Sequence, residues 1–164
     1  MGKVIGGGLP VGAYGGRSEI MDRVAPAGPV YQAGTLSGNP LAVAAGLAAL
    51  RRLESEQPYA KLEALGLRLE RGLTDAMSKA GVRGSVNRVG SMFTLFFTER
   101  KVIDFTSAKT SDTVRFNAYF QAMLEEGIYL PPSQYEAAFI SAAHTEVDID
   151  HTIEIARNAI GKLS

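Results

Sequence analysis

Cysteine is absent from this sequence of 164 residues, and histidine occurs only twice. Without cysteine there can be no disulfide bond, thiolate metal site or cysteine nucleophile. The two histidines, His144 and His151, offer too few ligands for a histidine metal cluster, so we expect no metal site. Lysine and arginine total 17, as do aspartate and glutamate, and the formal net charge is zero. This balance lacks the basic excess of nucleic-acid-binding proteins, and we expect no nucleic-acid partner.

Long apolar runs are also absent. No stretch approaches the roughly 20 apolar residues that a membrane-spanning helix needs, and the first residues lack the charged and apolar regions of a signal peptide. Hydrophobic residues make up 46% of the chain and charged residues 21%, which is typical of a globular protein. We therefore expect a soluble protein with no membrane partner.

What the sequence does contain, at its start, is a lysine followed by a glycine-rich run, GKVIGGGLPVGA over residues 2–13. Glycine lets the backbone adopt positive φ or approach a ligand closely, and a deprotonated lysine can form a Schiff base. The run therefore indicates either a covalent Lys3 beside a small molecule or a plain turn with a solvated lysine. A Walker A loop is excluded because the glycines follow the lysine, and a dinucleotide fingerprint because Val11 stands at its third glycine.

A second loop, Gly34-Thr35-Leu36-Ser37-Gly38, leads into a helix. Asn39 is predicted to be the N-cap and Pro40 the first helical residue, and a small, apolar helix follows to about residue 53. The loop is either a plain helix entry or an anion site made of backbone N–H groups and the hydroxyls of Thr35 or Ser37. As an anion site it would suit a phosphate better than a carbonyl.

A short helix is predicted over 19–23, capped by Ser18. From residue 58 onward, long helices are interleaved with short strands, and a polar loop is predicted over 99–110. Later helices are predicted over 59–80, over 111–126 with Ser111 as cap, and after the cap Asp148; strands are predicted over 85–89, 92–98, 128–130 and 137–141. Apolar side chains on both faces of 92–97 indicate burial on both sides. The pattern predicts an α+β layer with helices on one face of a small sheet.

Two polar residues flank the last predicted strand. Glu136 precedes an apolar segment, where a carboxylate is costly unless it has a partner. A salt bridge and a site carboxylate are both compatible with its position. His144 follows the strand and is predicted to be a loop histidine that makes a hydrogen bond. His151 is predicted to face solvent on the last helix.

Residues 2–13 resemble the lysine segment of class III aminotransferases, fold-type I enzymes that use pyridoxal 5′-phosphate. Three further stretches are similar to one family within this class, the glutamate-1-semialdehyde 2,1-aminomutases. They are APAGPVYQAGTLSGNP over 25–40, YLPPSQYE over 129–136 and FISAAHT over 139–145. Together these stretches are more specific than the lysine segment, which alone identifies only the class.

The resemblance implies roles for five residues. Lys3 is expected to form the internal aldimine with the cofactor and to move protons between cofactor and substrate. Gly34 and Thr35 are expected to bind the phosphate of the cofactor of the neighbouring subunit in a homodimer. Tyr31 and Glu136 are expected to lie near the substrate.

The family isomerises glutamate 1-semialdehyde to 5-aminolevulinate for porphyrin and chlorophyll biosynthesis. The reaction starts from the pyridoxamine 5′-phosphate form of the cofactor. The resemblance implies a location in the cytoplasm, or in the plastid stroma for a plant or alga. Another class III ω-aminotransferase is the alternative enzyme, and a non-catalytic fragment that serves as a binding or folding module is the alternative of a different kind.

The resemblance covers nearly the whole chain but only the C-terminal part of family members. We expect residues 1–57 to be a remnant of the large cofactor-binding domain and residues 58–164 to be the small C-terminal α+β domain, in an overall α/β protein. The aspartate that pairs with the pyridine nitrogen in the family has no counterpart here. This chain alone is therefore expected to be inactive.

Overall fold

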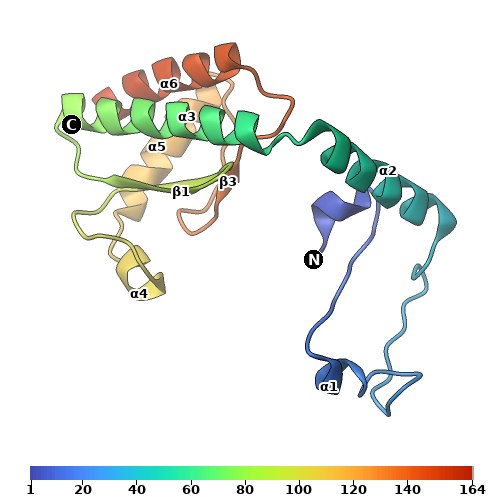
Figure 1. Ribbon diagram of the computed structural model, residues 1–164. Coiled ribbons are helices and arrows are strands. Elements are labelled where there is room, and N and C mark those ends of the chain that lie inside the picture. The colour runs from blue at the N-terminus through green and yellow to red at the C-terminus, as the bar shows by residue number, and fades with distance from the viewer. Residues whose placement is uncertain (164) are drawn as a thin grey trace. The chain divides into compact units, whose positions relative to one another are not determined.

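The computed structural model describes residues 1–163, except for the side chain of Lys3. The chain divides into two compact units, Met1–Gln57 and Pro58–Ser164, and Figure 1 labels most of their elements. In the first unit these are η1 (Lys3–Gly6), α1 (Ser18–Met21) and α2 (Pro40–Glu56). In the second they are α3 (Tyr59–Ala80), β1 (Ser85–Val89), β2 (Met92–Phe96), α4 (Phe105–Ala108), α5 (Thr113–Glu125), β3 (Ala138–Phe139) and α6 (Glu146–Gly161). None of the described helices is both long and apolar enough to cross a lipid bilayer.

Helix α2 dominates the first unit and begins where the sequence predicts. The side chain of Asn39 accepts hydrogen bonds from the N–H groups of Leu41 and Ala42, both at 3.1 Å, and proline occupies the first turn. The helix runs three residues beyond the predicted end and stops at Gln57, whose φ is 42°. Four large apolar side chains of α2 are exposed, namely Leu41, Val43, Leu47 and Leu50. Within this chain, α2 is therefore packed on only part of its surface.

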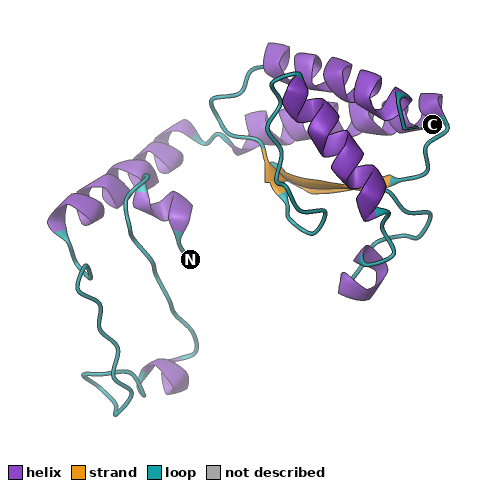
Figure 2. Cartoon of the chain, turned by 180° about the vertical axis from the view of Figure 1, so that it is seen from behind, coloured by secondary structure: helices purple, strands orange, loops and turns teal. Residues whose placement is uncertain are grey.

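The second unit is built on an antiparallel sheet with strand order β1-β2-β3. Val86 lies opposite Leu95, and Phe93 lies opposite Ala138. Strands β1 and β2 are joined by a tight turn in which Gly90 has a φ of 58°. Figure 2, in which the strands are orange, shows the sheet beside the helices of this unit. Helices α3 and α6 lie side by side in both views and contact each other along their length.

The apolar stripes of helices α3, α5 and α6 pack together with the end of β2 in one hydrophobic core. The predicted stripe of α6 is confirmed, because each of its four residues is buried; these are Ile149, Ile153, Ala156 and Ile160. A second, smaller cluster joins Phe96 to Val102 and Ala108. Because successive strand residues point to opposite faces, β2 is buried on both sides at Leu95 and Phe96. The prediction of two-sided burial is wrong at the start of the strand, where Met92 is 40% exposed.

Arg88 of β1 ties the sheet to α3. Its guanidinium donates to Glu70 at 2.7 Å, to Glu63 at 2.8 Å and to the carbonyl oxygen of Gly90 at 2.8 Å. The hydrogen bond from Arg88 lowers the pKa of the Glu63 carboxyl. A nearly buried arginine is thus fully partnered, as burial of a charge requires.

Several predicted boundaries are wrong for local reasons. Helix α4 lies inside the predicted polar loop and is started by Asp104, whose carboxylate accepts from the N–H of Ser107 at 2.7 Å. Asp112, not Ser111, caps α5. Helix α1 begins at Ser18, after Arg17, so the serine is the first helical residue and not the cap.

The strand predictions after α5 are also corrected. Residues 128–130 have no strand structure, and β3 contains only Ala138 and Phe139 where 137–141 is predicted. The reason is pairing, because β3 contacts β2 only at Met92 and Phe93. A segment with strand-like composition becomes a strand only where a neighbour accepts its hydrogen bonds.

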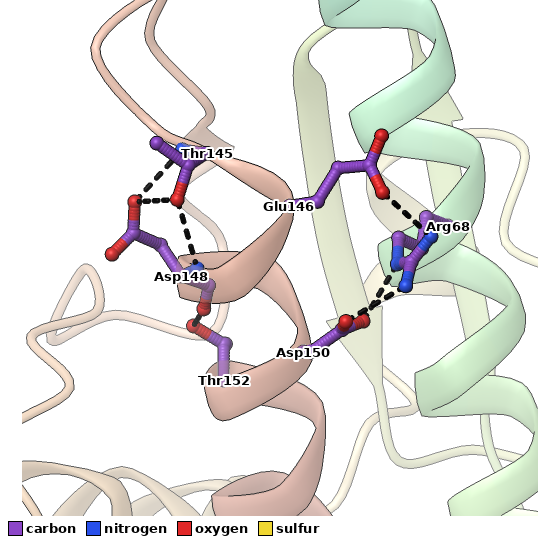
Figure 3. Close-up of polar contacts among 6 residues, drawn as sticks. All are labelled: Arg68, Thr145, Glu146, Asp148, Asp150 and Thr152. Atoms are coloured by element: carbon purple, nitrogen blue, oxygen red, sulfur yellow. Dashed lines mark hydrogen bonds and ion pairs between the residues drawn. The ribbon is translucent and has the colours of Figure 1, made fainter.

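Helix α6 begins with a capping box, shown in Figure 3. The Thr145 hydroxyl accepts from the N–H of Asp148, and the Asp148 carboxylate accepts from the N–H of Thr145 at 2.7 Å. Thr145 is therefore the cap, and Asp148, the predicted cap, is the third helical residue. The reciprocal pair satisfies two donors that a helix start leaves unpaired.

Figure 3 also shows Arg68 of α3 bridging to α6. Its guanidinium contacts the Asp150 carboxylate through two nitrogens, at 2.6 and 2.7 Å, and Glu146 at 3.2 Å. The hydrogen bond from Arg68 lowers the pKa of the Asp150 carboxyl below its ordinary value of 3.8. This bidentate pair is the geometry in which an arginine–carboxylate contact is strongest.

The Arg68–Asp150 pair predicts acid sensitivity of the second unit. A carboxyl whose pKa is lowered by folding stabilises the fold above its unfolded pKa, and that contribution is lost as the pH falls through the folded pKa. Between about pH 6 and about pH 3, Asp150→Asn should therefore lose less free energy of unfolding than the unsubstituted chain. Urea unfolding followed by circular dichroism measures this difference.

Glu154→Gln is the matched control, because Glu154 is exposed on the same helix and has no ion-pair partner among residues 1–163. It should leave the acid dependence unchanged. If Asp150→Asn and Glu154→Gln have the same pH dependence as the unsubstituted chain, the ion pair does not contribute to acid stability.

Candidate functional site

The two loops that stand out in the sequence meet in the first unit. They border a hollow of about 380 Å³ together with the first turn of α2. Its lining residues are Pro10, Val11, Gly12, Gly34, Leu36, Ser37, Gly38, Asn39, Ala42 and Val43. Gly34 thus lines the hollow, whereas Thr35 stands beside its lining and is exposed. Residues more than twenty positions apart in the sequence form one concave surface.

The loop over residues 34–39 offers hydrogen-bond donors. Ser37 N–H donates to Gly34 O at 2.9 Å and Asn39 N–H to Leu36 O at 3.1 Å. Within the described part of the chain, the N–H groups of Gly34, Thr35 and Gly38 have no acceptor. Since Asn39 already occupies N–H groups at the start of α2, the loop supplies the unpaired donors. Unpaired N–H groups beside the positive end of a helix are suited to an anion.

The opening loop rests directly on the backbone of α2. Gly7 has a φ of 58°, and a Cβ atom at this position would lie 2.7 Å from the carbonyl oxygen of Ala45. A Cβ atom at Gly46 would lie 2.7 Å from the carbonyl oxygen of Ile5. Both distances are far shorter than a Cβ contact allows, so glycine on each side permits this close approach. The contact fixes η1, whose first residue is Lys3, against the helix.

Gly46 supports the opening loop, a role that the sequence did not predict. Its signal was a glycine inside an alanine-rich helix, where glycine costs about 1 kcal/mol relative to alanine. That cost indicates a packing reason, but the partner, Ile5, is distant in the sequence and could not be named from it.

The five predicted site residues are placed unequally. The Lys3 side chain lies outside the described residues. Tyr31 is 83% exposed in the first unit. Glu136 is exposed in the second unit, and its carboxylate has no ion-pair partner in the part of the chain that is described. A salt bridge for Glu136 is thus not found, and the roles of all five residues stay predictions.

The backbone around Glu136 is held more firmly than its carboxylate. Its N–H donates to Ser133 O at 3.1 Å, and its carbonyl accepts from the Thr94 hydroxyl at 3.3 Å. His144 has the predicted loop role, because its Nδ1 accepts from the N–H of Ser141 at 2.9 Å. The described residues contain no group of three side chains suited to a metal ion.

Comparison with known proteins identifies the family. The family model for class III aminotransferases matches residues 1–160. The chain belongs to the class III aminotransferases. Glutamate-1-semialdehyde 2,1-aminomutase 2 of Brevibacillus brevis is 60% identical over 162 residues, 99% of this chain and 38% of that protein. The aminomutase of Persephonella marina is 58% identical over 163 residues with the same coverage. The chain thus spans about 38% of the length of these relatives.

Solved transaminases share the fold of this chain. An omega-transaminase from Sphaerobacter thermophilus matches with a TM-score of 0.83 and 28% identity, over 99% of this chain and 38% of that one. A transaminase with bound PLP matches with a TM-score of 0.82 and 26% identity, over 99% and 37%. A glutamate-1-semialdehyde aminomutase from Pseudomonas aeruginosa PAO1 matches with a TM-score of 0.72 and 22% identity, over 80% and 29%. The predicted fold class, the C-terminal part of a fold-type I transferase, is confirmed.

The contact between Gly46 and Ile5 predicts the effect of one methyl group. Gly46→Ala should force the opening loop away from α2 and destabilise the first unit by about 1–3 kcal/mol, as overpacking does. Hydrogen exchange of the backbone amides over residues 5–9 should accelerate accordingly.

Gly15→Ala is the control, because a Cβ atom at Gly15 would meet nothing within 4 Å. It should leave these exchange rates unchanged. Helix propensity alone predicts the opposite result for Gly46→Ala, a gain of about 1 kcal/mol, and such a gain would show that the loop does not depend on the contact.

Proposed function

We propose that this chain is part of a glutamate-1-semialdehyde 2,1-aminomutase, which isomerises glutamate 1-semialdehyde to 5-aminolevulinate. The observation that carries this proposal is the 60% identity to the Brevibacillus brevis aminomutase across 99% of the chain. The proposed setting is tetrapyrrole biosynthesis, leading to porphyrins and chlorophyll, in the cytoplasm. Residues 1–57 would belong to the cofactor-binding domain and residues 58–164 to the small domain.

The first unit fits a phosphate-bearing cofactor, proposed to be pyridoxal 5′-phosphate or its pyridoxamine form. The hollow offers space beside the unpaired N–H groups of Gly34, Thr35 and Gly38. Gly34 and Thr35 would hold the phosphate, and in a homodimer that phosphate would belong to the cofactor of the neighbouring subunit. When bound, this cofactor acts as an electron sink for negative charge on a substrate carbon.

The remaining proposed roles belong to three side chains. Lys3 would hold the cofactor through Nζ and move a proton between substrate carbons, which requires its amine to be neutral. The Glu136 carboxylate would accept hydrogen bonds from the amino group of the substrate. Tyr31 would place its hydroxyl near the substrate. Support for the Glu136 role comes from its exposed, unpaired carboxylate on an anchored backbone.

Activity can be tested by completing the chain with the remainder of the Brevibacillus brevis aminomutase. The completed enzyme should convert glutamate 1-semialdehyde to 5-aminolevulinate without an added amino acceptor. Lys3→Ala should reduce this rate by at least about 100-fold, as loss of a proton-transferring group does. Chromatographic measurement of 5-aminolevulinate gives both rates.

An ω-aminotransferase would give a different result in the same assay. It would turn over only when an external amino acceptor is supplied, and 5-aminolevulinate would not accumulate. That outcome would replace the aminomutase assignment with the alternative enzyme of the same class.

This chain without the remainder is expected to bind pyridoxal phosphate weakly on Lys3 and to show no turnover. The physical reason is that a reactive lysine needs a surrounding pocket that lowers its pKa, and the chain spans about 38% of its relatives. Borohydride reduction followed by mass spectrometry measures the pyridoxyl group on Lys3, with Lys3→Ala as the control. Stoichiometric capture together with turnover would show that residues 1–164 form a complete site.

A further inference from the structure

Gln134 is a buried polar side chain in the segment that carries Glu136. It is 3% exposed, although the two residues that follow it, Tyr135 and Glu136, are exposed. An amide that loses water and gains no partner destabilises a protein. The side chain of Gln134 must therefore make a contact that offsets its burial.

That contact is with the backbone of β2. Gln134 Nε2 donates to the carbonyl oxygen of Leu95 at 2.8 Å. Strand β3 pairs with β2 only at Met92 and Phe93, so it offers no partner at Leu95. The Gln134 amide thus continues, with a side chain, the hydrogen bonding that β3 ends.

Further contacts hold the same turn. The Thr94 hydroxyl donates to Glu136 O at 3.3 Å, one residue along β2 from Leu95. The ring of Tyr135 packs edge-on against Phe105, with ring centres 5.7 Å apart. Residues 134, 135 and 136 therefore each contact another element of the second unit, whereas the carboxylate of Glu136 has no ion-pair partner among the described side chains.

The free-energy cost of burying the Gln134 amide argues against a purely structural role. Its Oε1 is buried and has no hydrogen-bond partner within residues 1–163. Methionine has a similar size and would fill the same space without a buried, unpaired oxygen. What methionine cannot do is donate a hydrogen bond to Leu95.

We propose that Gln134 is a positioning residue for Glu136. Its amide fixes the turn over residues 133–136 to β2, so that the Glu136 carboxylate meets the amino group of the substrate in one place. This inference rests on the proposed function, because that function assigns Glu136 to the substrate. Site groups must be held within about 0.5 Å to act well, and a buried hydrogen bond beneath the site supplies that precision.

Gln134→Met tests the anchor in this chain, and hydrogen exchange is the first measurement. The amide of Glu136, which donates to Ser133 O, should exchange at least about 10-fold faster in the variant, as local opening of the turn implies. The amides of α6 should be unaffected. Ile153→Val, a change in the core of the same unit, is the control for general destabilisation, and it should not accelerate Glu136 selectively.

The second measurement is made in the completed enzyme. Gln134→Met should raise KM for glutamate 1-semialdehyde by about 10-fold with little change in kcat, the pattern of a lost binding contact. In an enzyme that already carries Glu136→Gln, the same substitution should have no further effect on KM. That loss of additivity is a readout that a merely structural role would not produce.

Three results are decisive against parts of this account. Unchanged exchange at Glu136 in Gln134→Met overturns the anchor itself. Faster exchange, with KM raised by Glu136→Gln but not by Gln134→Met, overturns the positioning role. If the unsubstituted enzyme makes no 5-aminolevulinate, the proposed function fails, and the exchange measurement still decides whether Gln134 anchors the turn.

Discussion

The first unit depends on one backbone-to-backbone contact, where the opening loop touches helix α2. Gly7 and Gly46 face the carbonyl oxygens of Ala45 and Ile5, respectively, at distances that no Cβ atom tolerates. Because η1 begins at Lys3 and packs on α2 through this contact, the position of the lysine segment follows from it. Gly7 of the run thus has a packing role, and a ligand is not needed to explain it. This structural role and the proposed covalent role of Lys3 are compatible, since a reactive lysine benefits from a fixed backbone.

In the second unit, the third strand of the sheet is too short to pair with the whole of β2. Strand β3 contains two residues, yet β2 continues to Phe96 with polar backbone groups that need partners. Side chains take over beyond β3, because Gln134 bonds to the backbone of β2 and the Thr94 hydroxyl bonds to the backbone of Glu136. A buried polar group destabilises the fold unless it is hydrogen-bonded. Because β3 is so short, the segment that precedes it contacts the sheet through side chains.

Features encoded locally could be predicted from the sequence. Asn39 and Pro40 start α2, and the stripe of α6 is buried, because caps and helical periodicity depend on neighbouring residues. The absence of a strand over 128–130 and the length of β3 could not be predicted, since they depend on pairing with β2. Of the site, the residues alone indicated Lys3, the loop of Gly34 and Glu136 as candidates with a plainer alternative for each, and the resemblance to a family supplied their expected roles. The burial of Gln134 could not be predicted, because it is set by a sheet edge formed far away in the sequence.

Unpaired polar groups need a physical criterion before a role is assigned to them, because every protein surface has many. The carboxylates of Glu63 and Asp150 are paired with arginines, and their lowered pKa values reflect a structural use. Glu136 differs in that its backbone is bonded on two sides while its carboxylate has no partner among the described side chains. The N–H groups of Gly34 and Thr35 have the same character, as unpaired donors in a turn closed by its own hydrogen bond. A backbone ordered beneath an unpaired group has already lost its conformational entropy on folding. It also lowers the cost of binding a ligand of opposite polarity, which in the proposed function is a phosphate at the donors and an amine at the carboxylate.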